Sequence, residues 1–435
     1  PPPSGTVTAT LGGAKTNGWF TAAPTLTISK PADVTVQASV DGGPFGPPPS
    51  TITGDGAHTI DIRASNGDTL SLIAPVDTTA PEIVIGTPAN GGRYVLNSVV
   101  PADYFCRDSG SGVAASTPCS GTVPNGQPIN TSSVGTKTFT VQSIKDVAGH
   151  TTPAKTVTYT VVYRPIVFSS GRTGDGDIYT VNSDGTQLTR LTSTAGLDEQ
   201  PAWSPDGSKI AFASDRNNAM GSGLDIYVMD ANGQNVTRLT TAGNDDTAPS
   251  WSPDGTKIVF QSKRDGNPEI YVMNANGTAQ TRLTNSKTQD AEPAWSPSNL
   301  PGGQKIAFLS DRNGSLNVWV MNVDGTGQTQ LTATKQPDGT PSWSPNGSKI
   351  LFASKRGDNK GTTFDLYTMN PNGTGVVRLT TSKGGDFEGT WSRDGLEIAL
   401  TSLRDGNQEI YKMKANGSGQ TRLTNNTALD RQPDW

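Results

Sequence analysis

Six tryptophans recur at a nearly constant interval through the last part of this chain. They are Trp203, Trp251, Trp295, Trp343, Trp391 and Trp435, separated by 48, 44, 48, 48 and 44 residues. Each occupies the same place in a repeated pattern, which is clearest as Pro-Ala-Trp-Ser-Pro-Asp-Gly at 201–207. A period of about 40 to 50 residues with several short strands in each repeat is typical of β-propeller blades. The repeat therefore predicts the architecture, whereas it indicates little about function.

Each repeat predicts four strands joined by tight turns. The Trp lies on the first strand, an apolar run such as 210–213 on the second, an Ile-Tyr pair on the third, and a Leu-Thr pair ends the fourth. Pro-Asp-Gly and Asn-Gly or Asp-Gly stand at the joints, and these residues favour the backbone of tight hairpins. Six copies predict six blades. The first copy, from Ile166, lacks a first strand, so we expect the C-terminal strand at 432–435 to complete it and to close the ring.

These residues resemble the WD-like repeat of TolB-type β-propellers. The shared pattern is Pro-x-Trp-Ser-Pro-Asp-Gly-x-Lys-Ile followed by Ser-x-Arg, Ile-Tyr and Arg-Leu-Thr, in register over 164–435. Small departures are Asn346 for the turn Asp, Arg393 for the turn Pro and Trp319 for Tyr. TolB carries an α/β domain ahead of its propeller, through which it works in the cell envelope. We find no such domain in this sequence, so the resemblance implies the fold and not the role.

The N-terminal third has the composition of β-sandwich modules. It is poor in charge, rich in Thr, Val, Gly and Pro, and alternates in the manner of strands, as at 34–38. A break at 77–81 divides it into two modules, 1–79 and 80–163, and both resemble bacterial Ig-like modules of secreted and surface proteins. The predicted fold is thus all-β, with two Ig-like β-sandwich modules ahead of a six-bladed propeller at 164–435. The only two cysteines, Cys106 and Cys119, predict a disulfide and an oxidising compartment.

Composition limits the classes of partner. A net charge of −5 argues against nucleic-acid binding, which needs a basic face. No run of 18 apolar residues occurs, so no membrane-spanning segment is predicted. The chain begins Pro-Pro-Pro without a signal peptide, and we expect an extracellular or cell-surface protein from which that peptide has been removed.

The propeller repeats offer little catalytic chemistry. Both histidines, His58 and His150, lie in the N-terminal third, and residues 164–435 contain neither His nor Cys. This excludes a Ser-His-Asp triad or a His-bound metal within the propeller. Cleavage of a glycan by a pair of carboxylates stays an open alternative, because acidic residues are plentiful. We predict a protein that is not an enzyme and that requires no cofactor.

A ring of carboxylates is the strongest candidate site. An Asp stands five residues before every repeated Trp, at Asp198, Asp246, Asp290, Asp338, Asp386 and Asp430. Around one mouth of the channel these would bind Ca²⁺ or a cationic ligand, since hard cations prefer oxygen.

A structural role is the alternative for this ring. Ser-x-Arg also recurs, giving Arg172, Arg216, Arg264, Arg312, Arg356 and Arg404, and hairpin register sets each Arg opposite an Asp. Such pairs would neutralise the ring through charge-assisted hydrogen bonds. Both readings hold if each Asp keeps a free oxygen.

Apolar residues in the long loops between the second and third strands are candidates for partner contact, namely Met220, Leu224 and Phe364.

The leading hypothesis is a non-catalytic module that binds a protein or glycan at the cell surface, with the Ig-like modules as a stalk. One alternative is a self-assembling subunit of an extracellular filament or surface layer, in which residues 1–10 dock on a neighbouring copy. Another is a glycan-active enzyme.

Overall fold

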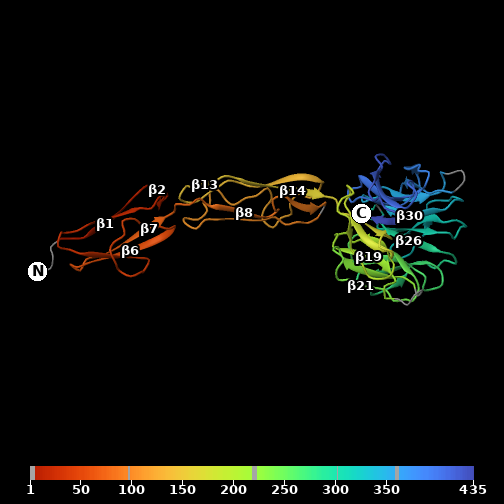
Figure 1. Ribbon diagram of the computed structural model, residues 1–435, viewed down its shortest axis with the longest axis horizontal. Coiled ribbons are helices and arrows are strands. Elements are labelled where there is room, and N and C mark those ends of the chain that lie inside the picture. Colours follow the sequence, from red (N-terminus) through yellow and green to blue (C-terminus); the bar gives the residue numbers. More distant parts are fainter. Residues whose placement is uncertain (1–4, 97, 218–222, 301, 358–361) are drawn as a thin grey trace. The chain divides into compact units, whose positions relative to one another are not determined.

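The computed structural model describes residues 5–96, 98–217, 223–300, 302–357 and 362–435. Every regular element in these ranges is a β-strand, as Figure 1 illustrates, so the all-β prediction is confirmed. The chain divides into two compact units, Pro1–Val162 and Tyr163–Trp435. Among the described residues, no helix is long and apolar enough to cross a bilayer.

The first half of the N-terminal unit contains a two-stranded and a five-stranded sheet. The smaller pairs β1 (Thr8–Gly12) with β4 (Thr25–Ser29); the larger has the order β2 (Lys15–Thr16), β3 (Trp19–Phe20), β7 (Thr69–Val76), β6 (Gly56–Ala64) and β5 (Val36–Val40). Strands β6 and β7 lie side by side in Figure 1. Alternation along them buries Ile60, Ile62, Ala74 and Val76 in one core, while Ile73 points outward and is 67% exposed.

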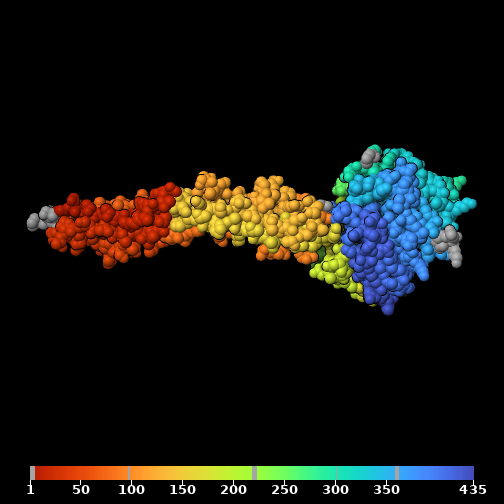
Figure 2. Space-filling view, turned by 90° about the horizontal axis from the view of Figure 1, so that it is seen from above, coloured from red at the N-terminus to blue at the C-terminus, as the bar shows by residue number. Residues whose placement is uncertain are grey.

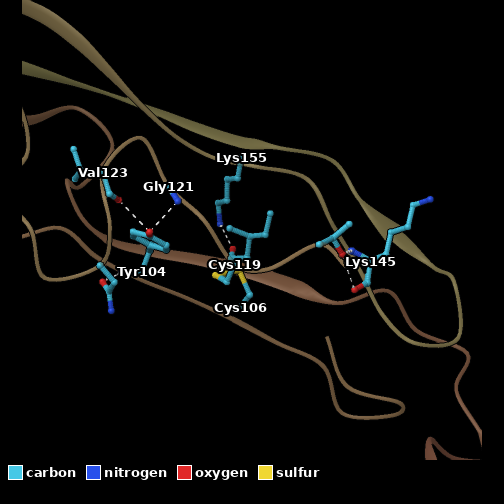
Figure 3. Close-up of a disulfide and its surroundings, with 10 residues drawn as sticks. Tyr104, Cys106, Cys119, Gly121, Val123, Lys145 and Lys155 are labelled. Carbon is cyan, nitrogen blue, oxygen red and sulfur yellow. Dashed lines mark hydrogen bonds between the residues drawn. A yellow bond between two sulfur atoms is a disulfide. The ribbon is translucent and has the colours of Figure 1, made fainter. Parts of the chain in front are cut away.

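The second half of this unit is built from shorter sheets. They pair β8 (Glu82–Thr87) with β10 (Asp103–Arg107), β14 (Lys155–Val162) with both β11 (Gly135–Val141) and β9 (Gly92–Val95), and β12 (Ile144–Lys145) with β13 (Thr151–Thr152). Cys106 on β10 forms a disulfide with Cys119 (Figure 3). Beside it, the Tyr104 hydroxyl accepts a hydrogen bond from the Gly121 amide at 2.8 Å and donates to the Val123 carbonyl at 3.0 Å. The loop that carries Cys119 is therefore fastened to β10 twice.

In its described residues the C-terminal unit consists of six four-stranded antiparallel sheets. In order from the first strand of each repeat, they are β38 (Asp430–Asp434), β15 (Ile166–Ser170), β16 (Asp177–Val181), β17 (Thr189–Arg190); β18 (Asp198–Trp203), β19 (Lys209–Ser214), β20 (Asp225–Asp230), β21 (Thr237–Arg238); β22 (Asp246–Trp251), β23 (Lys257–Ser262), β24 (Glu269–Asn274), β25 (Thr281–Arg282); β26 (Asp290–Trp295), β27 (Lys305–Ser310), β28 (Asn317–Asn322), β29 (Thr329–Gln330); β30 (Asp338–Trp343), β31 (Ile350–Ser354), β32 (Asp365–Met369), β33 (Val377–Arg378); β34 (Asp386–Trp391), β35 (Glu397–Ser402), β36 (Glu409–Lys414) and β37 (Thr421–Arg422). This is a β-propeller, as the repeat predicts.

The last strand joins the two ends of the propeller. Strand β38 pairs with β15, and it also packs against β34 and β18 of the neighbouring sheets. The Trp435 indole donates to the Arg164 carbonyl at 2.9 Å. Sheets from β30 onward, cyan to blue in Figure 2, form a continuous surface. Because β38 pairs with β15, the edge of β15 is not left open to pair with another chain.

A β-bulge interrupts the first strand of each of these six propeller sheets. Pairing with the second strand shifts register after the residue that follows the Asp. The next residue takes a positive φ although it is not glycine; the six are Gln200, Ala248, Glu292, Thr340, Glu388 and Gln432. A bulge adds a residue and redirects the side chain at that point. We call these six residues the bulge ring.

Candidate ligand site in the propeller

A cavity of about 600 Å³ lies where the six first strands meet. Its lining includes the six repeated tryptophans, the prolines that precede them in five repeats, and the bulge ring. It extends from the bulge ring to turn residues such as Pro205 and does not include the ring of Asp residues. The cavity therefore lies toward the turns between first and second strands. Its volume, and a lining that combines aromatic and apolar side chains with polar groups, are those of ligand sites in proteins.

The bulge ring is linked from sheet to sheet by hydrogen bonds. A side-chain oxygen of one member accepts from the backbone amide of the next in four cases, Gln432 to Gln200 at 3.1 Å, Gln200 to Ala248 at 2.9 Å, Glu292 to Thr340 at 2.9 Å and Glu388 to Gln432 at 2.8 Å. Ala248 has no such oxygen, and Gln261 accepts from the Glu292 amide at 3.3 Å instead. The inner wall of the cavity is thus ordered by polar contacts, and its side chains differ from repeat to repeat.

Glu388 is the member of the bulge ring whose pKa is shifted most strongly from its ordinary value. Burial raises its pKa to about 7, and the nearby charge of Glu292 adds to the effect. One of its oxygens accepts hydrogen bonds from the Thr401 hydroxyl and the Gln432 amide, both at 2.8 Å. The group therefore gains and loses its charge near neutral pH.

Two guanidinium groups line the same cavity. Arg164 is 8% exposed and donates to the Ser204 carbonyl at 2.8 Å, but its Nε is buried and finds no partner among the described residues. Arg393 is half-buried and forms no hydrogen bond or ion pair within the described ranges. Burial lowers the pKa of both groups, that of Arg164 to about 10, and the charge of Arg393 contributes to the lowering at Arg164.

The predicted ring of aspartates lies inside the sheets. All six residues are at most 1% exposed. Each meets the Arg at the end of the second strand: Asp198–Arg216 at 2.6 Å, Asp246–Arg264 at 2.9 Å, Asp290–Arg312 at 2.7 Å, Asp338–Arg356 at 2.9 Å, Asp386–Arg404 at 2.9 Å and Asp430–Arg172 at 2.6 Å. Each Arg also donates to the Ser two residues before it. These contacts are the structural arrangement that the hairpin register predicts.

One group of potential metal ligands comes together in the N-terminal unit. Asp77, Asp146 and His150 present ligand atoms within 4.8 Å of one another, the one such group of three among the described residues. His150 Nδ1 lies 2.9 Å from an Asp146 oxygen and 3.9 Å from one of Asp77. The Ser111 amide donates to the other Asp77 oxygen at 2.9 Å. The His150 amide also donates to the other Asp146 oxygen at 2.8 Å, so hydrogen bonds hold these side chains together.

The proposed loop contacts lie at the opposite end of the strands from the cavity. Leu224 and Phe364 are half-buried, and Met220 falls outside the described residues. Phe364 packs against the core between the β30–β33 sheet and the β34–β37 sheet, and the Lys355 ammonium lies 4.9 Å from the centre of its ring. This ring therefore contributes to the fold, whatever else it contacts.

The constant spacing of Asp and Arg in the repeats was recognisable in the sequence, whereas the bulge ring was not. The position two residues after each Asp holds Gln, Ala, Glu or Thr, but the position directly after each Asp differs in all six repeats, so variation alone did not single out the bulge ring. Arg393 was visible only as a departure from the turn Pro, and Arg164 lies ahead of the first complete repeat.

Comparison with known proteins agrees with the fold. The family model described as TolB beta propeller domain matches residues 218–360 and 340–435. A stretch of 43 residues is 54% identical to a TolB homolog of Chlorobium luteolum and 49% identical to one of Chlorobium chlorochromatii. Each match spans 10% of this chain and 10% of the relative. The structure of TolB from Acinetobacter baumannii is similar over 70% of this chain and 80% of that one, with 20% identity and a TM-score of 0.54, which supports the fold alone.

Proposed function

This chain belongs to the family of TolB β-propeller domains, and we propose that it is a non-catalytic binding protein whose propeller receives an extended segment of a protein partner in the central cavity. Propellers of this family are protein-binding modules. The observation that carries the proposal is the cavity itself, in which the rings of six Trp and several Pro residues alternate with polar and charged side chains. About 600 Å³ accommodates a few side chains but no folded domain, so an extended segment fits best.

The carboxylates of the cavity support a binding role over catalysis. Glycoside cleavage needs one carboxyl group as acid and a second as base or nucleophile. In the bulge ring, Glu292 and Glu388 each accept a hydrogen bond from a backbone amide of the next sheet. We assign both to shaping the inner wall. Glycan binding without cleavage is the second outcome that a test must distinguish.

We further propose that the protein works outside the cytoplasm, at the cell surface or in the surrounding medium. The disulfide supports this, because such bonds persist in oxidising compartments. The sheets of the N-terminal unit suit the Ig-like modules that the sequence resembles, and in this proposal they serve as a stalk.

Site-specific photo-cross-linking tests the placement of the partner. A cross-linking side chain is introduced at Ser298, an exposed residue that lines the cavity, and in a matched chain at Lys287, an exposed residue in the loop that leads to the first strand of the same repeat. Each chain is irradiated on intact source cells, and the products are identified by mass spectrometry. We expect one defined protein adduct from Ser298 and none from Lys287.

Other patterns would contradict this placement. An adduct from Lys287 alone would move the contact to the loop face near Leu224. Adducts between copies of this chain would favour the filament or surface-layer alternative. A glycan adduct from Ser298 would keep the cavity as the site and replace the class of partner.

A further inference from the structure

We infer that Arg164 and Arg393 bind a carboxylate group of the partner peptide at the mouth of the central cavity. This inference rests on the proposed function and adds the chemistry of the ligand. Both side chains line the cavity. Arg393 occupies the turn position where Pro205, Pro253, Pro297 and Pro345 stand in the other repeats. The fold therefore does not need a cation there.

The two guanidinium groups are left with unused donors. The buried Nε of Arg164 has no partner among the described residues, and Arg393 makes no polar contact there. A buried cation whose donors are unpaired loses its hydration without compensation. Because the charge of Arg393 contributes to the lowered pKa of Arg164, the two cations act on each other. An anion between them would offset both costs.

The two carboxylates whose charge acts on Arg164 already accept hydrogen bonds from other groups. Asp206 accepts from the Ser204 hydroxyl at 2.6 Å and from the Ser208 amide at 3.0 Å. Asp434 accepts from the Trp203 amide at 2.7 Å and from the Thr390 hydroxyl at 3.1 Å. Both attract Arg164 at longer range, and Asp206 also attracts Arg393, yet no ion pair among the described residues joins either carboxylate to either Arg.

A peptide carboxylate fits this environment better than a phosphate group. A guanidinium group matches the planar geometry of a carboxylate. Glu292, Glu388 and Asp434 also line the cavity, so a group with two negative charges would meet more repulsion than one with a single charge. The apolar remainder of a peptide can pack on the Trp and Pro rings.

A groove beside Arg393 offers the rest of the peptide a way out. It has a volume of about 610 Å³ and runs between the turns at 344–348 and 393–396. Lys349 and the amides of Asn299, Asn346 and Asn416 are among its lining residues. Side-chain amides can hydrogen-bond to an extended backbone. Arg393 belongs to both linings and would orient a peptide that enters the cavity from this groove.

Selection from a random dodecapeptide library on the immobilised full chain tests the inference. The library is displayed once with a free C-terminus and once with a blocked one, which separates a terminal carboxylate from Asp or Glu side chains. The affinity of selected peptides is then measured for three variants. Arg393→Pro restores the repeat residue, Ala248→Phe fills the cavity at its smallest ring position, and Lys257→Gln removes a cation that lines neither cavity nor groove. Thermal unfolding verifies that each variant is folded.

We expect selected peptides to be enriched in Asp or Glu, or to require the free C-terminus. Arg393→Pro should weaken their binding at least about tenfold, the loss of one charge-assisted pair, whereas Lys257→Gln should leave it unchanged. Neutral peptides that ignore Arg393→Pro but are lost with Ala248→Phe would overturn this inference and leave the proposed function standing. Peptides that bind all variants equally, or no selected peptide at all, would overturn both.

Discussion

At the scale of single residues, Glu388 links the stability of the propeller to pH. Its carboxyl group has a pKa of about 7 in the folded chain, above the ordinary value of 4.5, because it is buried. As pH rises from about 4.5 to 7, the unfolded chain releases this proton before the folded chain does. Proton linkage then lowers the free energy of unfolding over that interval, by about 2 to 3 kcal/mol for this group.

Glu388→Gln should remove this dependence, because the amide is neutral at every pH. We expect the variant to exceed the wild type in stability at pH 8 and to match it at pH 4.5. Chemical denaturation followed by tryptophan fluorescence at both values measures the difference. Glu82→Gln, at an exposed position in the N-terminal unit, is the control. An equal gap between variant and wild type at both pH values would contradict this account of Glu388.

The buried Asp–Arg pairs differ from surface pairs in what their loss costs. Arg216 is 8% exposed and meets Asp198, which is 1% exposed, at 2.6 Å. Arg216→Met leaves a buried carboxylate without its cation and should lower the free energy of unfolding by about 3 to 5 kcal/mol. Lys209→Met breaks an exposed pair with Asp230 in the same sheet and should cost less than about 1 kcal/mol. Equal losses in urea unfolding would disprove the structural role of the Asp–Arg pairs.

At the scale of elements, β38 should determine whether the first sheet is complete. Removal of residues 430–435 would expose the edge of β15, strip Arg172 of its partner Asp430 and delete the buried Trp435. We expect faster amide exchange along β15 and a lower melting temperature, with restoration by a synthetic peptide of residues 429–435. An unchanged melting temperature would mean that β38 does not close the propeller.

The turn residues of the hairpins made most propeller strands predictable from the sequence, whereas the bulges could not be predicted from it. Pro-Asp-Gly and Asn-Gly indicate turns, and the apolar runs between them indicate strands. At the bulge, Gln200 and Glu388 adopt φ values of 53° and 52° that their residue types do not signal. Tertiary packing of six strands around one axis imposes that backbone. The cavity wall formed by the bulge ring consequently stayed hidden while the Asp and Arg positions, set by simple register, were foreseen.

At the scale of the whole molecule, closure of the propeller ring brings residues from distant repeats together around the cavity. Gln200 and Gln432 are separated by most of the propeller sequence, yet the Gln200 amide donates a hydrogen bond to the Gln432 side-chain oxygen at 3.1 Å. A repeat reports which positions are alike, whereas the proposed ligand site depends on positions that differ, such as Ala248, Glu388 and Arg393. Sequence reasoning consequently identified the frame and directed attention to the loop face at Leu224 and Phe364, away from the cavity.

The most direct test of the binding proposal is amide hydrogen exchange on the full chain, with and without the captured partner. The account predicts slower exchange in the first strands and in the turns around the cavity, including 204–208 and 392–396, while the loops around Leu224 and the N-terminal unit stay unchanged. Protection confined to the loop face or to the N-terminal unit, with no change at the cavity, would contradict it.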